Sequence, residues 1–241
     1  MHKIRDICGL CASEREVLEE TSMQRCSNCD VLFEAQTVCR QGHYICGTCR
    51  EALARKAMIA YCLESDAQDV YALVVALMKL EHTAMHGPEH HLLLPAALLT
   101  AYKNRGGEIV LEEALEEANR RSGQIPGGAC GHWGACGAAL GAGIFLSIVL
   151  EASPLSEREW HLAGQLTARC IDRISAQGGP RCCKRDTFLA LGTVLDFIDE
   201  HLGLSFALPV EIRCEFFVNN AQCKTSECPF FGVNRSRSED K

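Results

Sequence analysis

The sequence predicts a mainly α-helical protein with a small cysteine-rich module at its N-terminal end and a cysteine-rich loop near its C-terminal end. Three observations lead to this fold class. Apolar residues recur at helical spacing over most of residues 51–202, the strand signal is confined to about 210–218, and cysteines at metal-ligand spacing crowd the first 50 residues. We therefore expect a zinc-binding module at 1–50 and an all-α bundle that forms a redox or metal domain at 51–210. A Cys-rich segment packed on the bundle should follow at 211–231, and a disordered tail at 232–241.

Composition narrows the classes of function. The chain has 241 residues, 47% of them hydrophobic, so it can bury one substantial core. A formal net charge of −7 and the lack of a long basic run argue against nucleic acid as a partner. The longest apolar run is shorter than the roughly 20 residues that span a bilayer, and the first residues lack the apolar region of a signal peptide. We expect a cytoplasmic protein in which the closely spaced cysteines among its 16 serve as metal ligands rather than in disulfides.

The N-terminal module contains eight ligand-type residues in closely spaced pairs. The spacing predicts two zinc ions, because two pairs of this kind close one tetrahedral site. A segment this short has little apolar surface, so metal binding would supply its folding free energy. The eight residues are Cys8, Cys11, Cys26, Cys29, Cys39, His43, Cys46 and Cys49.

Two pairings of these ligands fit the spacing. A cross-braced arrangement groups Cys26, Cys29, Cys46 and Cys49 on one metal and Cys8, Cys11, Cys39 and His43 on the other. A sequential arrangement groups Cys8, Cys11, Cys26 and Cys29 on one metal and Cys39, His43, Cys46 and Cys49 on the other. From Cys26 to Cys49 the pattern resembles the first three ligand pairs of a RING finger, which implies a treble-clef or RING-like module. The RING's fourth pair is missing after Cys49, which favours a structural zinc module over a ubiquitin-ligase role.

Apolar periodicity and glycine or proline breaks place seven helices in the central part of the chain. Short connections between them predict near-antiparallel neighbours in a bundle. Cys62 and Cys170 lie in apolar helical runs, and we expect both to be buried, inert thiols. The predicted helices cover about 51–64, 67–86, 88–104, 108–121, 135–151, 156–176 and 184–202.

A glycine-rich stretch at 127–145 is typical of a site rather than of packing. Its glycines let the backbone approach a ligand closely, while Cys130, His132 and Cys136 supply metal ligands or nucleophiles. The apolar helix that follows directs its N-terminus at these cysteines, which favours thiolates.

Two further groups of reactive side chains flank this stretch in the sequence. His82 and His86 are spaced to share a helix face, and His90 and His91 fall in the first turn of the next helix. Cys182 and Cys183 lie at a helix start between Arg181 and Lys184, where a lowered thiol pKa is expected. Because successive helices reverse direction, we predict one pocket that contains Cys136, one of the two adjacent cysteines, and at least one of His86, His90 and His91, with Arg181 and Lys184 at its rim.

The C-terminal loop adds Cys214, Cys223 and Cys228, the last followed by proline, as in some iron–sulfur ligand runs. A cluster held by these three thiolates needs a fourth ligand from elsewhere in the chain, and Cys182 and Cys183 are the candidates. A third zinc site is the competing interpretation.

Two resemblances extend these patterns. The segments Cys136-Gly137-Ala138-Ala139 and Cys182-Cys183-Lys184-Arg185 make the helical part similar to a family assigned as redox-active and named for its C-GCAxxG-C-C cysteine pattern. The resemblance implies a helical fold and a shared site at Cys136 and one of Cys182 and Cys183. The first cysteine of that family has no counterpart here and is replaced near His90 or His91. The whole chain resembles an uncharacterised prokaryotic family of unknown function.

The leading hypothesis is a metal-binding redox protein with an iron–sulfur cluster or reactive thiol pair in the helical domain. Its zinc module would serve structure or the docking of a protein or electron-transfer partner. The first alternative is a zinc-stabilised interaction or regulatory protein without catalysis. The second is a thiol-dependent transferase that uses Cys182 or Cys183 as nucleophile with a histidine as base.

Overall fold

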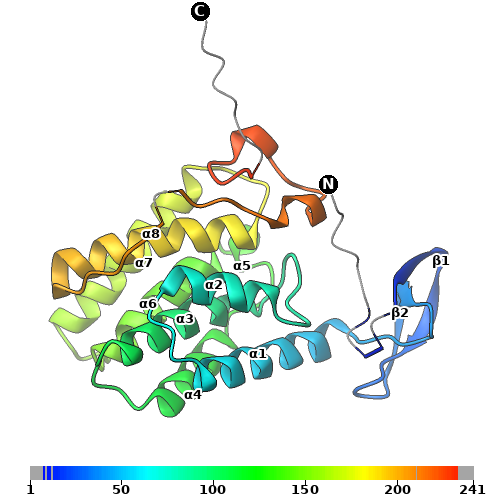
Figure 1. Cartoon of the computed structure of the whole chain (residues 1–241), viewed down its shortest axis with the longest axis horizontal. Coiled ribbons are helices and arrows are strands. Elements are labelled where there is room, and N and C mark those ends of the chain that lie inside the picture. The colour runs from blue at the N-terminus through cyan, green and yellow to red at the C-terminus, as the bar shows by residue number, and fades with distance from the viewer. Residues whose placement is uncertain (1–7, 9, 12, 210, 233–241) are drawn as a thin grey trace, which may run out of the picture.

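A two-stranded hairpin precedes a bundle of helices in the computed structural model, which describes residues 8, 10–11, 13–209 and 211–232 (Figure 1). The predicted mainly helical fold is confirmed. The elements of the described chain are β1 Arg15–Arg25, β2 Leu32–Cys39, α1 Gly47–Glu64, α2 Val70–Lys79, α3 His90–Asn104, α4 Leu111–Ser122, α5 Ala129–His132, α6 Gly137–Val149, α7 Arg158–Ser175, α8 Cys183–Leu202, and the short 3-10 helices η1 Phe216–Asn219 and η2 Thr225–Glu227.

The hairpin contradicts the prediction that strands occur only near 210–218. β1 and β2 are antiparallel, with Arg25 opposite Leu32 and Arg15 opposite Cys39. The register shifts between Val17 and Ser22, so β1 carries extra residues there. Most of β1 is exposed on both faces. A strand without a buried face lacks the alternation that reveals strands in a sequence, and this explains the miss.

Residues 211–218, in contrast, form no regular strand. Cys214 makes an isolated bridge to Phe231, and the chain then turns into η1. Phe216 is buried in the helical core, and Phe230 packs edge-on against Phe188 at 5.4 Å between ring centroids. Aromatic anchoring on the core therefore outweighs the local strand preference of this segment. Val210, the first residue of the predicted strand, lies outside the described residues.

Helix α6 is central to the bundle and packs against α3, α4, α7 and α8. Its small residues make these approaches possible. A Cβ atom at Gly143 would lie 2.0 Å from Oγ1 of Thr167 on α7, so only glycine fits at this contact. Helix α3 is buried almost all round, from His90 to Ala101. The core therefore places the starts of α3 and α6 inside the protein rather than at its surface.

Helix α2 ends at Lys79, seven residues before the predicted end. His82 has a left-handed backbone with φ of 68°, and the carboxylate of Glu89 accepts a hydrogen bond from the N–H of Ala84 at 2.9 Å. This buried carboxylate supports an irregular path for the segment. The prediction that His82 and His86 share a helix face is therefore wrong.

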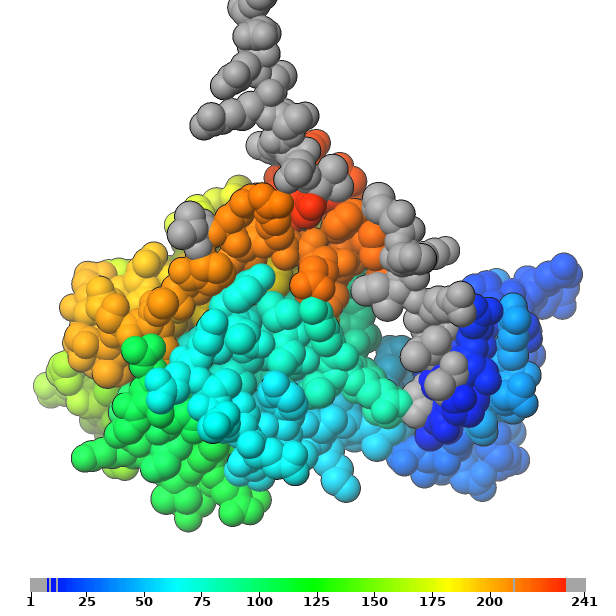
Figure 2. All heavy atoms as spheres, viewed as in Figure 1, coloured from blue at the N-terminus to red at the C-terminus, as the bar shows by residue number. Residues whose placement is uncertain are grey.

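The proposed division into domains remains a prediction, with one structural qualification at its first boundary. Helix α1 begins at Gly47 among the zinc-type ligands and runs to Glu64, across residue 50 (Figure 1). Figure 2 shows the hairpin module at one end of the molecule, and the segment after α8 (orange to red) lying against α2 (cyan). The predicted disordered tail lies outside the described residues apart from Gly232. None of the described helices is long and apolar enough to span a bilayer.

Candidate metal centres

The first N-terminal donor set consists of four thiols brought together by the hairpin turn and the start of α1. Cys26 and Cys29 lie in the turn between β1 and β2, Cys46 is the N-cap residue of α1, and Cys49 lies in its first turn. The four sulfur atoms all lie within 4.8 Å of one another. Four thiolates at this spacing are a donor set that Zn²⁺ binds tetrahedrally.

The second set joins Cys8 and Cys11 to the end of β2. Sγ of Cys11 lies 3.4 Å from Sγ of Cys39 and 3.3 Å from Nδ1 of His43. With Cys8, these donor atoms again lie within 4.8 Å of one another. The structure therefore has the cross-braced grouping of the two that the spacing allowed.

Backbone N–H groups point at the sulfurs of both sets. Gln41 donates to Cys39 at 3.3 Å and Cys46 donates to Cys26 at 3.3 Å. Burial raises the pKa of Cys26, but the N–H of Cys46 and neighbouring donors outweigh it and bring the pKa to about 6. Hydrogen bonds from Ser13 lower the pKa of Cys11 to about 6. Both sets thus contain a thiol prepared to act as a thiolate ligand.

A third group of thiols lines a small cavity between the start of α8 and the C-terminal segment. Its four cysteines come from two distant parts of the chain: Cys182, Cys214, Cys223 and Cys228. The rest of the lining is largely aromatic or apolar, with Arg185 and Asn220 as polar members. The cavity is mostly enclosed. Within the described residues, no three of these thiols lie within 4.8 Å of one another, in contrast to the N-terminal sets.

The local backbone around these thiols resembles that in the zinc-type sets. The N–H of Thr225, two residues after Cys223, donates to its sulfur at 3.3 Å, as Gln41 does to Cys39. Burial raises the pKa of Cys214 to about 11, and the N–H of Phe216, again two residues later, acts against it. The loops thus supply backbone donors to both sulfurs.

The predicted lowering of the thiol pKa at the start of α8 is wrong. Burial raises the pKa of Cys182, and it raises the pKa of Cys183 to about 11. The negative charge of Asp186 acts in the same direction on both thiols. Arg185 lowers the pKa of Cys182, but it is paired with Asp186 at 2.9 Å, and the burial of the sulfur outweighs its effect.

Cys136 lies on the other side of Asp186 rather than among the cavity residues. Its sulfur is 3.8 Å from Oδ2 of Asp186, while Oδ1 of that carboxylate accepts from Arg185. Burial raises the pKa of Cys136 to about 12, and the charge of Asp186 adds to this. Arg185 and Asp186 therefore connect the cavity to Cys136. Cys130 lies in the short helix α5, half-exposed.

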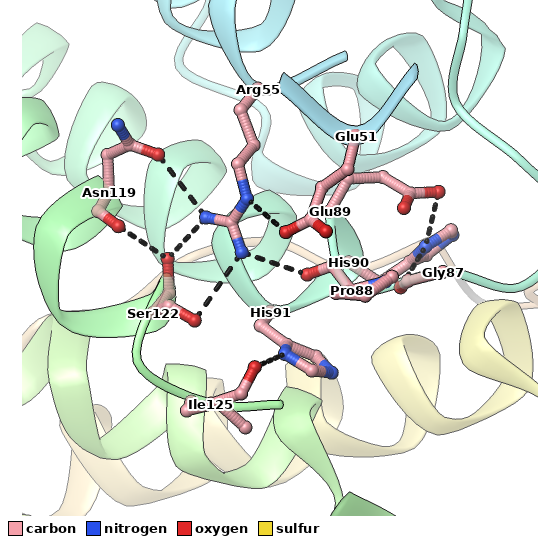
Figure 3. Close-up of polar contacts among 10 residues, drawn as sticks. All are labelled: Glu51, Arg55, Gly87, Pro88, Glu89, His90, His91, Asn119, Ser122 and Ile125. Atoms are coloured by element: carbon pink, nitrogen blue, oxygen red, sulfur yellow. Dashed lines mark hydrogen bonds and ion pairs between the residues drawn. The ribbon is translucent and has the colours of Figure 1, made fainter. Parts of the chain in front are cut away.

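The three predicted histidines take different positions around the start of α3, and Figure 3 shows two of them, His90 and His91. Nδ1 of His91 hydrogen-bonds to the carbonyl of Ile125 at 3.2 Å, and its ring lies where a side chain on Gly137 would be. His90 is fully buried beside Glu89, and its Nε2 has no hydrogen-bond partner among the described residues. Nδ1 of His86 lies 3.5 Å from the backbone N of Cys183. These contacts place the starts of α3, α6 and α8 beside one another.

The two predicted rim cations are arranged differently from each other. Arg181 is exposed, whereas Lys184 is buried, donates to the carbonyl of Met78 at 3.3 Å and lies 4.9 Å from the ring centre of Phe216. Arg185 takes the cavity position instead. The predicted burial of Cys62 and Cys170 is confirmed, since both are fully buried with pKa values that burial raises to about 11 and about 12.

Residues 58–231 match the model of a family of unknown function, DUF5714. The chain belongs to this family. The matched span contains all four cavity cysteines and Asn220 but neither N-terminal donor set. No curated protein and no solved structure matches the chain.

Sequence reasoning missed Asn220. It included Arg185 and Asp186 in the reactive stretch around the adjacent cysteines, but not their ion pair or the place of Arg185 in the cavity lining. Asn220 lies in a polar loop that carries no spacing signal. Only the fold, by bringing the C-terminal loop to the start of α8, reveals these contacts.

Proposed function

We propose that this protein is a redox protein that carries an iron–sulfur cluster on Cys182, Cys214, Cys223 and Cys228 and two zinc ions in its N-terminal module. The observation that carries the proposal is the four-cysteine cavity. Four cysteine thiolates are the usual ligands of iron–sulfur clusters, which transfer single electrons. The cavity is mostly enclosed and lined by Met85 and three phenylalanines, so it suits electron transfer better than the binding of a substrate.

The spacing of the thiols supports a cluster over a single zinc ion. Zinc–sulfur bonds of about 2.3 Å in a tetrahedron put ligand sulfurs about 4 Å apart, which agrees with the N-terminal sets. No three of the cavity thiols, all of which lie in the described part of the chain, meet this spacing. A cluster of several irons needs ligands further apart than one metal ion does.

The zinc module is proposed to have two roles, as a metal-dependent fold and as a docking surface for an electron-transfer partner. Its apolar contacts are few, because the buried cluster of the module consists of Cys26, Ile45, Cys46 and Cys49. Metal would therefore supply most of its stability. Val17, Met23, Val31 and Leu32 remain exposed on the hairpin. Met23 and Leu32 lie on one face of it, because Leu32 is opposite Arg25, and exposed apolar side chains that share a face support protein binding.

Metal analysis with matched variants tests the proposal. Protein purified without oxygen should contain two zinc ions per chain together with iron and acid-labile sulfide. Cys182→Ser should lose the iron and keep the zinc, whereas Cys183→Ser, one residue away and outside the cavity lining, should keep both. Cys26→Ser should lose zinc and keep iron. Wild-type protein with zinc alone, even after reconstitution with iron and sulfide, would show the iron–sulfur assignment to be wrong.

A zinc-stabilised interaction protein without redox chemistry is the second candidate, favoured by the exposed apolar residues of the hairpin. In that case the cavity would hold a third zinc ion, and three zinc ions per chain would be found. The thiol-transferase hypothesis loses its main support, because burial raises the pKa values of Cys182 and Cys183 rather than lowering them.

A further inference from the structure

The side chain of Asn220 connects a histidine to one of the cavity cysteines. Its Nδ2 lies 3.6 Å from Sγ of Cys182, and its Oδ1 lies 3.1 Å from Nε2 of His86. Asn220 is only 8% exposed, and both it and Cys182 line the cavity. A buried amide thus reaches a sulfur that we assign as a ligand.

The orientation of this amide follows from its neighbours. The backbone N–H of Gln222 donates to Oδ1 of Asn220 at 3.0 Å. An N–H group can only donate, so the atom that faces it must be the carbonyl oxygen. The NH₂ end of Asn220 is therefore directed at the sulfur of Cys182.

The tautomer of His86 follows in the same way. The backbone N–H of Cys183 donates toward Nδ1 of His86 at 3.5 Å, so Nδ1 carries a lone pair. The ring proton must then be on Nε2, which donates to Oδ1 of Asn220. Burial lowers the pKa of His86, which keeps the ring neutral. Two donors, His86 and Gln222, thus hold the amide in one orientation.

We propose that Asn220 is a positioning residue of the cluster site: it donates an N–H···S hydrogen bond to the Cys182 thiolate, and His86 locks it in that orientation. The inference rests on the proposed function. A neutral thiol sulfur is a weak acceptor, whereas a metal-bound thiolate is a charged one, so a locked amide donor suits a ligand. Hydrogen bonds to ligand sulfurs help set cluster reduction potentials. A hydrogen-bond donor to a ligand sulfur stabilises the reduced cluster, which carries more negative charge, so Asn220 raises the reduction potential of the cluster.

The test is a redox titration of anaerobically loaded protein, followed by electron paramagnetic resonance. Asn220→Leu removes the donor and should lower the ratio of reduced to oxidised cluster at a fixed potential about tenfold, which is 59 mV for a one-electron couple. His86→Leu should give a smaller shift in the same direction, because Asn220 remains but is no longer locked. His86→Gln should restore the wild-type potential, because an amide N–H can replace Nε2–H as donor to Oδ1.

Asn219→Leu is the matched control, since Asn219 is the exposed neighbour of Asn220 and should leave the potential unchanged. Fully loaded Asn220→Leu protein with the wild-type potential would overturn the positioning role and leave the proposed function standing. If Asn220→Leu does not fold, His86→Leu decides: a lowered potential supports the inference and an unchanged one overturns it. Wild-type protein that holds no iron after loading would overturn the proposed function and this inference together.

Discussion

Replacement of Arg55 should weaken the attachment of α1 to the rest of the bundle. The guanidinium of Arg55, on α1, is buried and donates five hydrogen bonds (Figure 3). Three elements provide the acceptors: Glu51 on α1 at 2.9 Å, Pro88 before α3 at 3.1 Å, and the α4 residues Asn119 and Ser122 at 2.9 to 3.4 Å. One side chain therefore ties α1 to α4 and to the segment that carries the histidines.

The size of the effect follows from what Arg55→Met leaves behind. Methionine keeps the apolar stem but strands the buried hydroxyl of Ser122 and the carbonyl of Pro88 without this donor. Breaking a buried ion pair costs about 3–5 kcal/mol. The side chain of Glu51 is 28% exposed, so water can solvate it after the change. We expect a loss near the lower limit, about 3 kcal/mol in the free energy of unfolding.

Urea unfolding of metal-loaded protein, followed by far-UV circular dichroism, measures this loss. Arg120→Met is the matched control, because Arg120 is 64% exposed and its pair with Glu117 should contribute less than about 1 kcal/mol. Glu51→Gln should cost less than Arg55→Met, since four neutral acceptors remain for the guanidinium. The reasoning is refuted if Arg55→Met costs no more than Arg120→Met.

Three further predictions follow from single contacts. Gly137→Ala would put a Cβ 1.9 Å from the His91 ring and should lower the free energy of unfolding by about 1–3 kcal/mol. Gly164→Ala, on α7 with no atom near its Cβ position, should raise it by about 0.5–1 kcal/mol. Thermal unfolding distinguishes the two variants. Burial lowers the pKa of His90 to about 4, whereas the ordinary pKa of histidine is about 6.5. Between these two pH values the unfolded chain binds one proton more than the folded protein. The free energy of unfolding should therefore fall by about 3 kcal/mol as the pH is lowered through that window. His90→Gln should remove that part of the slope in urea titrations at several pH values, and an unchanged slope would contradict the assignment. A strong chelator should unfold the hairpin but leave α2–α8 folded, because the main core contains none of the N-terminal ligands. Limited proteolysis of the chelated protein measures this. Cleavage of α6 or α8 as readily as β1 would contradict the prediction.

The longer helices could be predicted from the sequence because apolar residues recur in them at helical spacing, whereas the short α5, in the glycine-rich stretch, was not predicted. The predicted ends of α3, α4, α6, α7 and α8 lie within about three residues of the observed ones. The end of α2 could not be found, because Glu81–His86 is compatible with a helix and only the buried carboxylate of Glu89 supports another path. The hairpin was missed for a related reason, since the buried cluster of its module consists mainly of ligand-type cysteines rather than of an apolar strand face.

The N-terminal donors could be identified from spacing, because two ligands in one knuckle are close in sequence and in space. Their grouping could not, since both pairings satisfy the same spacing. The hairpin decides it by bringing the end of β2, with Cys39, beside Cys11 at 3.4 Å between sulfurs. Cross-bracing is therefore a consequence of strand pairing, which the sequence pattern of β1 conceals.

The choice between Cys182 and Cys183 shows most clearly what spacing leaves open. The two thiols are adjacent, and either one could complete the set formed by the C-terminal cysteines. Cys182 is the N-cap residue of α8 with an extended backbone, so its side chain leaves the helix toward the cavity. Cys183 is the first helical residue, and its backbone N–H is directed to His86. Asn220 then reaches Cys182 from the C-terminal loop while its other end is held by His86. The helix start thus separates two neighbouring thiols into a candidate ligand and a part of the hydrogen-bond network that supports it.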